Sequence, residues 1–269
     1  MKNEASVVLG EEFRRTPERR NFMAKNPKLI AVTSGKGGTG KSSICYGLGY
    51  TLAKQGHRTL IIELDFGLRC LDIMFGMSGS VQYDLGDVLS GKKEILDAVT
   101  HVPSASNLNI LCAPKDPFMK VTAEQVVDIC RKIRKYFDFI IIDTGAGINS
   151  HVFDVVEQAN LILVVTTPDP VCIRDATMMS DEFYRRGNKR QRLIVNKMNK
   201  KNITSKLIEN LDEIIDTVGI QLIGVIPEDF ALAEATGKGV PVALNAPSLL
   251  AFDAISKRLN GEQIPLVIK

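Results

Sequence analysis

Short apolar segments alternate with longer amphipathic ones along almost the whole chain. The apolar segments have Val, Ile and Leu at consecutive positions, which is typical of strands that are covered on both faces. These segments are Leu29–Thr33, Thr59–Leu64, Leu108–Cys112, Phe139–Asp143, Leu161–Thr166, Leu193–Asn196 and Leu222–Ile226. Helical periodicity marks the longer segments Ser42–Gln55, Ala123–Tyr136, Ile173–Arg186 and Thr204–Val218. The alternation predicts right-handed βαβ units and therefore an α/β fold, with a mostly parallel, twisted sheet of about seven or eight strands and helices on both faces.

A single domain accounts for this pattern, because no internal repeat, low-complexity tract or second boundary interrupts it. We expect the domain to span residues 28–269. Residues 1–27 lie outside the pattern, since Arg14-Arg15, Pro17 and Arg19-Arg20 make them polar and interrupt any helical period. They are predicted to form a flexible N-terminal extension, and an arm that binds a partner or a lipid is the alternative.

Composition and charge restrict the classes of protein to which this chain can belong. Hydrophobic residues make up 45% of the chain and charged residues 24%, the usual mixture for a soluble protein with a full core. The net charge of +3 indicates no strong attraction to nucleic acid. The five cysteines include no CxxC pair, which argues against a disulfide framework or a zinc site and favours a reducing cytoplasm. No apolar run approaches the roughly 20 residues of a membrane span, so we expect a cytoplasmic protein, with peripheral contact at the inner face of the cell membrane left open.

A glycine-rich segment with two lysines lies between the first predicted strand and the first predicted helix. Glycines leave room for successive backbone N–H groups to turn towards phosphate oxygens, and the helix N-terminus adds partial positive charge. Lys41 can neutralise the β- and γ-phosphates, and the Ser42 hydroxyl can bind Mg²⁺. The segment has the spacing and the context of a P-loop. The residues predicted to bind the phosphates are Gly35, Lys36, Gly37, Gly38, Thr39, Gly40, Lys41, Ser42 and Ser43.

The pair Lys36 and Lys41 makes this segment similar to the deviant Walker A motif of the MinD/ParA family of P-loop ATPases. The resemblance implies binding of ATP with Mg²⁺ and slow intrinsic hydrolysis. In that family the first lysine reaches the phosphates of the partner subunit in a nucleotide-sandwich dimer. The resemblance therefore implies a homodimer in the ATP state, in which Lys36 acts in trans much as an arginine finger does.

The segment Glu63–Asp72 resembles the switch I sequence of the family, DxDxGLRNLD. The resemblance implies that Asp65 positions the attacking water near the γ-phosphate, which makes it a predicted catalytic residue together with Lys36 and Lys41. Cys70 stands where the family has Asn, so the polar contacts of the segment are expected to differ. Glu63 is interpreted as a structural residue.

Asp143 ends an apolar strand, as the metal-binding carboxylate of a Walker B motif does. It is predicted to hold Mg²⁺, through water, together with Ser42. The next residues, Thr144-Gly145-Ala146-Gly147, resemble the switch II run DSPAG of the family. Gly145 replaces the proline, which should loosen this loop.

Two further strand ends match the positions where the family holds adenine. The first is Asn196-Lys197, and the second is Pro227-Glu228-Asp229. An amide such as that of Asn196 can hydrogen-bond a purine edge, while Pro227 packs beside the ring. We predict that Asn196, Pro227, Glu228 and Asp229 contact the base, and ordinary turn chemistry is the alternative explanation of both sequences.

The resemblance extends from Leu29 to about Lys269. Within the family, the proteins that place the division septum continue into a basic amphipathic helix that inserts into the surface of the bilayer. The given chain stops at Ile264–Lys269, which is too short for such a helix. Membrane cycling by that device is therefore not expected.

The function that these motifs favour is an ATP-dependent dimerising switch that positions cellular machinery. Asp65 to Asp72 and Arg174-Asp175 favour placement of the division septum, with protein regulators of division as partners. The alternatives are a related ATPase that positions flagella, chromosomes or cargo, and a redox or metabolic enzyme on the same fold. Nucleic acid is not expected as a partner, because the sequence has no separate basic face. Cys70, Cys112 and Cys172 lack the spacing of an iron–sulfur site.

Overall fold

The computed structural model of this protein describes residues 28–65, 69–119, 121–147, 150–199, 202 and 210–266. The predicted extension, residues 1–27, lies outside the described residues. The same is true of the first part of the helix predicted over Thr204–Val218.

One eight-stranded sheet lies in the described part of the chain. Its strands are β1 (Lys28–Thr33), β2 (Thr59–Leu64), β3 (Thr100–His101), β4 (Leu108–Leu111), β5 (Phe139–Thr144), β6 (Leu161–Thr166), β7 (Gln191–Met198) and β8 (Leu222–Pro227). They are ordered β3-β4-β2-β5-β1-β6-β7-β8, and every neighbouring pair is parallel except β3 with β4. The predicted α/β fold with a mostly parallel sheet is confirmed. β3 was not predicted, because two residues carry no periodic pattern.

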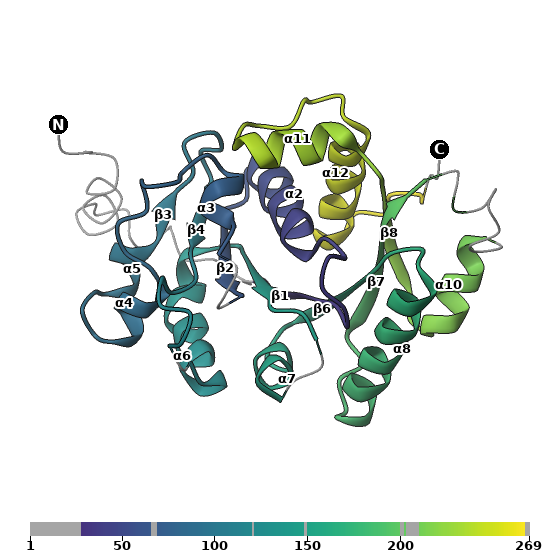
Figure 1. The fold of residues 1–269 in the computed structure, drawn as a ribbon, viewed down its shortest axis with the longest axis horizontal. Helices are drawn as coiled ribbons and strands as arrows, with labels where there is room; N and C mark the ends of the chain where they lie inside the picture. The colour runs from purple at the N-terminus through teal and green to yellow at the C-terminus, as the bar shows by residue number, and fades with distance from the viewer. Residues whose placement is uncertain are drawn as a thin grey trace.

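Helices cover both faces of this sheet (Figure 1). One face carries α2 (Lys41–Lys54), α11 (Phe230–Lys238) and α12 (Pro247–Leu259). The other carries α6 (Ala123–Ile133, continued by a 3-10 turn, Arg134–Tyr136), α7 (Ser150–Val156), α8 (Pro170–Arg185) and α10 (Leu211–Val218). Three short helices, α3 (Leu71–Met74), α4 (Leu85–Leu89) and α5 (Ile95–Ala98), lie between β2 and β3 in the chain. Among the helices of the described residues, none has the length and apolar run that a membrane span requires.

The two faces of the sheet belong to two hydrophobic clusters. Ile30 and Val32 of β1 point into the cluster that contains α2 and α12, while Ala31 between them points into the opposite one. The same alternation holds in β5, where Ile141 faces the first cluster and Ile140 the second. Side chains that alternate with a period of two are therefore buried on both faces, as the apolar runs of the sequence predict.

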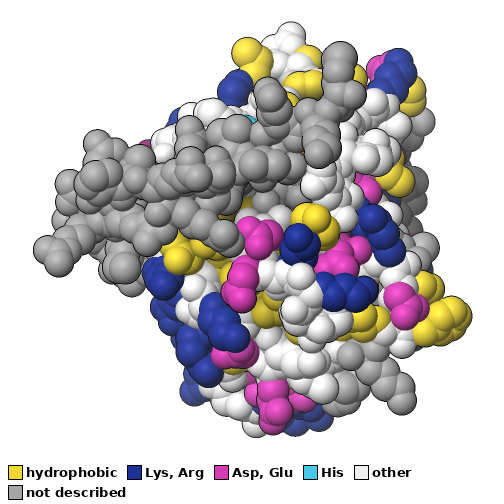
Figure 2. All heavy atoms as spheres, turned by 90° about the vertical axis from the view of Figure 1, so that its left-hand side faces the viewer, with side chains coloured by type: hydrophobic (Ala, Val, Ile, Leu, Met, Phe, Trp, Pro, Cys, Tyr) yellow, Lys and Arg dark blue, Asp and Glu magenta, His cyan; other side chains and the backbone are white. Residues whose placement is uncertain are grey.

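The side of the molecule that carries α4, α5 and α6 presents charges of both signs (Figure 2). On α6, for example, Asp128 pairs with Lys132 at 2.7 Å and with Arg131 at 3.8 Å. Lysine and arginine side chains on this side thus lie among carboxylates, and no field of a single sign arises from these pairs.

The close approach of α2 to α12 depends on Gly47. A Cβ at Gly47 would lie 2.2 Å from the Phe252 ring, and both residues are buried. We expect Gly47→Ala to lower the free energy of unfolding by roughly 1–3 kcal/mol, because the added methyl forces the two helices apart. Gly237→Ala is the matched control. Gly237 lies in α11 with no atom near its missing Cβ, so that change should raise the free energy by about 0.5–1 kcal/mol.

Urea unfolding of the two variants and the parent measures both changes. Equal stability of Gly47→Ala and Gly237→Ala would show that the contact between α2 and α12 is looser than the structure indicates.

Candidate functional site

The carboxyl ends of three neighbouring strands bring most of the predicted site residues together. Asp143 at the end of β5 is paired with Val32 of β1 on one side and with Glu63 of β2 on the other. Residues 34–40 follow β1 and lead into α2, and Asp65 follows β2 (Figure 1). Parallel sheets bind ligands at this edge, where the strand ends leave a crevice.

Lys41 lies inside the loop that joins β1 to α2. Its side chain is only 6% exposed, and its ammonium donates to the Ser34 hydroxyl at 3.2 Å. The Ser34 hydroxyl in turn donates to the carbonyl oxygen of Lys36 at 2.8 Å. This link holds the loop closed around the cation. Sequence reasoning missed Ser34, although its position directly before the glycine-rich segment could have indicated a role.

The N-terminus of α2 is available to an anion. Its cap residue Gly40 has φ 94°, and no side chain caps the helix or places an acid in the first turn. A Cβ at Gly40 would lie 2.3 Å from the amide nitrogen of Asn196, so the loop can pass this close only with glycine. The free N–H groups and the helix dipole both favour a phosphate here.

Lys36, unlike Lys41, lies at the surface. Its ammonium is 3.8 Å from Oδ1 of Asp169, and the two side chains are 46% and 47% exposed. Asp169 caps α8 by accepting from the N–H groups of Val171 and Cys172, both at 3.0 Å, and these bonds, chiefly that of Cys172, lower its pKa. A pair this exposed contributes little to stability, so Lys36 can leave it at small cost. No local sequence pattern indicates this contact.

Asp65 faces the switch II turn. Its Oδ1 would lie 3.9 Å from a Cβ placed on Gly145. Partial burial raises the pKa of Asp65, and the charge of Lys41 acts in the opposite direction. The effect of Lys41 indicates that this carboxylate lies near the cationic loop. Residues 66–68 of switch I and 148–149 of switch II lie outside the described residues.

Asp143 is fully buried, and in the described part of the chain neither of its carboxylate oxygens has a hydrogen-bond partner within normal geometry. Burial raises its pKa to about 7, although the Ser42 hydroxyl beside it acts in the opposite direction. A buried carboxylate without a partner, next to a serine hydroxyl, has the donor atoms that Mg²⁺ prefers. Asp143 and Ser42 therefore fit the predicted metal.

Cys70 adds a thiol to this neighbourhood. Burial raises its pKa to about 12, while the nearby Ser42 hydroxyl acts in the opposite direction. Burial also raises the pKa of the Cys45 thiol, and the charge of Asp143 adds to this effect. Both groups are therefore neutral thiols rather than reactive thiolates at neutral pH.

The predicted base residues lie at the ends of β7 and β8. The Asn196 amide donates to the carbonyl oxygen of Thr39 at 2.7 Å, which ties it to the phosphate loop. Glu228 accepts from the Asn199 amide. Asp229 caps α11 through Ala231 and also accepts from the N–H and hydroxyl of Ser248. These contacts give the side chains structural roles, and their contact with a base stays a prediction.

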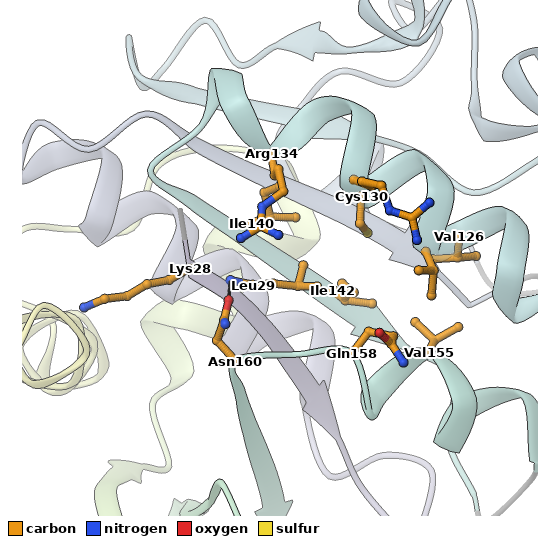
Figure 3. Close-up of a pocket in the computed structure, with 12 residues that line it drawn as sticks. Lys28, Leu29, Val126, Cys130, Arg134, Ile140, Ile142, Val155, Gln158 and Asn160 are labelled. Atoms are coloured by element: carbon orange, nitrogen blue, oxygen red, sulfur yellow. Dashed lines mark hydrogen bonds between the residues drawn. The ribbon is translucent and has the colours of Figure 1, made fainter. Parts of the chain in front are cut away.

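A separate cavity of about 130 Å³ lies between α6, α7 and the sheet (Figure 3). Its lining includes the apolar side chains Cys130 of α6 and Ile140 and Ile142 of β5, together with Arg134 and Gln158. None of the twelve residues that line it belongs to the loop of residues 34–43. The cavity is therefore not part of the site at the strand ends.

A parallel sheet whose central strand runs into a glycine-rich loop around a buried lysine defines a P-loop nucleotide-binding protein. Residues 30–242 match the family described as the CobQ/CobB/MinD/ParA nucleotide binding domain. The chain belongs to this family, in its MinD branch.

Several relatives support the assignment to this branch. The septum site-determining protein MinD of Synechocystis is 33% identical over 245 residues, which are 89% of this chain and 92% of that protein. The protein of the same name from Bacillus subtilis is 31% identical over 246 residues, 90% and 92% of the two chains. In the solved MinC:MinD cell division protein complex of Aquifex aeolicus, one chain superposes with a TM-score of 0.82 and 30% identity, covering 90% of this chain and 99% of its own length.

The raised pKa of Asp143 predicts that this carboxylate destabilises the fold at high pH. Its pKa of about 7 lies above the value of about 3.9 expected in the unfolded chain. Between these two values the folded state holds a proton that the unfolded state has lost, so this group lowers stability as pH rises. Asp143→Asn should therefore stabilise the protein more at about pH 8 than at about pH 5.

Urea unfolding in a chelator, without nucleotide, measures this difference. Addition of Mg²⁺ and ATP near pH 8 should then stabilise the parent more than the variant, because Asn is a poor ligand for the metal. The assignment of the pKa is wrong if Asp143→Asn changes stability equally at both pH values.

Proposed function

We propose that this protein is an Mg²⁺-dependent ATPase that dimerises with ATP bound and helps to place the division septum. The observation that carries the proposal is the contrast between two lysines of one loop. Lys41 is buried inside the loop, while Lys36 lies exposed beside it in a weak ion pair. A cation inside the loop can hold its own nucleotide, and one at the surface is free to reach a second subunit.

Residues 35–43 bind the phosphates in this proposal. Lys41 neutralises the β- and γ-phosphates, and the uncapped N-terminus of α2 offers backbone N–H groups to them. Ser42 and Asp143 hold Mg²⁺, which when bound offsets the negative charge of the phosphates. Asn196, Pro227, Glu228 and Asp229 form the corner that holds adenine.

Hydrolysis in this proposal depends on Asp65 and on the partner subunit. Asp65 lies next to switch II and near Lys41, where it can orient a water for attack on the γ-phosphate. Lys36 leaves Asp169 and contacts the phosphates of the partner, adding positive charge where negative charge develops. Hydrolysis is slow in the monomer because its site lacks the second lysine.

The relatives support the cellular role. Those cited above carry septum site-determining names, and the Aquifex aeolicus chain was solved in a MinC:MinD cell division complex. By analogy, the partners of this protein are regulators of cell division. The ATPase domain in this proposal spans residues 28–269, with residues 1–27 as an extension.

ATP-dependent dimerisation is the first test. We expect Asp65→Ala to accumulate as a dimer with ATP, because the dimer no longer dissociates through hydrolysis. Adding Lys36→Ala should leave nucleotide binding intact but return the protein to a monomer, since phosphates then face each other without the bridging cation. Light scattering after size-exclusion chromatography measures both. Lys132→Ala, which removes an exposed lysine of α6, is the control and should dimerise as before.

A double variant Asp65→Ala/Lys36→Ala that dimerises like Asp65→Ala would remove Lys36 from the interface. A crosslink between Lys36 and its own subunit's phosphates alone would contradict action in trans.

The cellular role predicts a spatial pattern. A fluorescent fusion in the native cell should gather at the poles or the septum, and the Lys36→Ala fusion should be diffuse because it cannot form the ATP dimer. Fluorescence microscopy of dividing cells measures both patterns. A pattern that follows the nucleoid would instead support chromosome partition and contradict septum placement.

A further inference from the structure

Glu63 is an acidic residue in the interior of the sheet. It is the next-to-last residue of β2, two positions before Asp65, and its side chain is 0% exposed. A carboxylate in such a place is costly unless donors satisfy it. The groups around Glu63 therefore indicate which part of the structure it holds in place.

Three backbone N–H groups donate to this carboxylate. Oε1 accepts from Cys70 at 2.6 Å and from Leu71 at 3.1 Å, and Oε2 accepts from Ala113 at 3.2 Å. Both oxygens are thus engaged by main chain rather than by a side-chain cation. Bonds to an ionised acceptor are roughly twice as strong as neutral ones, which makes this a firm anchor.

The anchor connects β2 to the start of α3. Cys70 is the N-cap residue and Leu71 the first residue of α3, a helix that has no side-chain cap of its own. Glu63 supplies that cap from the strand at the other end of the loop. Asp65 directly follows β2, and Arg69 directly precedes the helix start that the side chain of β2 holds.

The same carboxylate connects the loop to two further parts of the site. Cys70, which it holds, lies with its thiol against the proposed Mg²⁺ ligand Ser42. Ala113, its third partner, follows β4 and begins the turn in which Lys115 donates its N–H to Asp84. A shift of Glu63 would therefore move the start of α3 relative to both Ser42 and Asp65.

We propose that Glu63 is the positioning residue of switch I, which fixes Asp65 relative to the γ-phosphate by clamping the start of α3 and the turn after β4. This proposal rests on the proposed function, in which Asp65 orients the water that attacks the γ-phosphate. In this proposal Glu63 makes no direct contact with the nucleotide. It acts through the backbone it holds.

Glu63→Gln is the test. Both oxygens of the carboxylate accept N–H bonds, so an amide nitrogen at either place meets a donor and the clamp opens. We expect kcat to fall by at least about tenfold, with KM for ATP within about threefold of the parent, because Lys41 and its loop are untouched. Glu63→Asp keeps two acceptor oxygens and the charge, and should recover most of the lost kcat.

Asp138→Asn is the matched control. Asp138 accepts from the backbone N–H of Arg58 at 2.9 Å and from its guanidinium, at the opposite ends of β2 and β5. Asp138→Asn removes a carboxylate that connects the residues directly before these two strands, at the end of the sheet away from Asp65. Asp138→Asn should lower stability and leave kcat unchanged, which separates loss of fold from loss of positioning.

Hydrogen–deuterium exchange tests the clamp without hydrolysis. The amides of Cys70, Leu71 and Ala113 should exchange at least about tenfold faster in Glu63→Gln than in the parent, and at the parent rate in Asp138→Asn. Parent-like exchange or parent-like kcat in Glu63→Gln overturns the proposal. Failure of the parent itself to hydrolyse ATP would overturn the proposed function instead, and the exchange rates would still decide on Glu63.

Discussion

The buried ammonium of Lys41 is the charge around which the rest of the site is arranged. It lies where β1 ends and α2 begins, and the Ser34 hydroxyl fixes it there. A cation with so little access to water strongly favours an anion beside it. The uncapped start of α2 points its N–H groups to the same place. The loop can take this course because Gly40 has φ 94° and lies against Asn196 without a side chain. One charge and one strand–helix junction thus determine where phosphates can be bound.

The sheet order then decides which residues surround that charge. β5 lies between β1 and β2, so Asp143 and Glu63 are side by side near the ends of neighbouring strands although they are far apart in the sequence. The loops that leave these strands carry Asp65 and the switch II turn. Because the strands are buried on both faces, their ends have little freedom to move. The sheet therefore gives the site a rigid base.

The sequence was most informative where a pattern is local. Seven strands could be predicted from continuous runs of Val, Ile and Leu, and the phosphate loop from glycine and lysine spacing, because both depend on neighbouring residues alone. β3 and the short helices α3 to α5 were missed, since two to five residues show no period. The link of Lys36 to Asp169 and the hold of Asn196 on Thr39 join residues more than a hundred positions apart, and no local signal announces such contacts. Glu63 was interpreted as structural, but its three partners became visible only in the fold.

Two buried carboxylates on adjacent strands are unusual in a stable core. The different surroundings of Glu63 and Asp143 explain why both are present. Glu63 and Asp143 are in register, and the charge of Glu63 adds to the effect of burial in raising the pKa of Asp143. Burial raises the pKa of Glu63 as well, but three backbone N–H groups donate to its carboxylate and act in the opposite direction. Asp143 has no such donors within normal geometry among the described residues, and its pKa rises to about 7. The carboxylate without internal partners is therefore the one that gains most from a cation supplied with the nucleotide. Asp143 therefore lowers the stability of the fold more than Glu63 does. This difference is expected when one acid binds a ligand and the other holds the backbone in position.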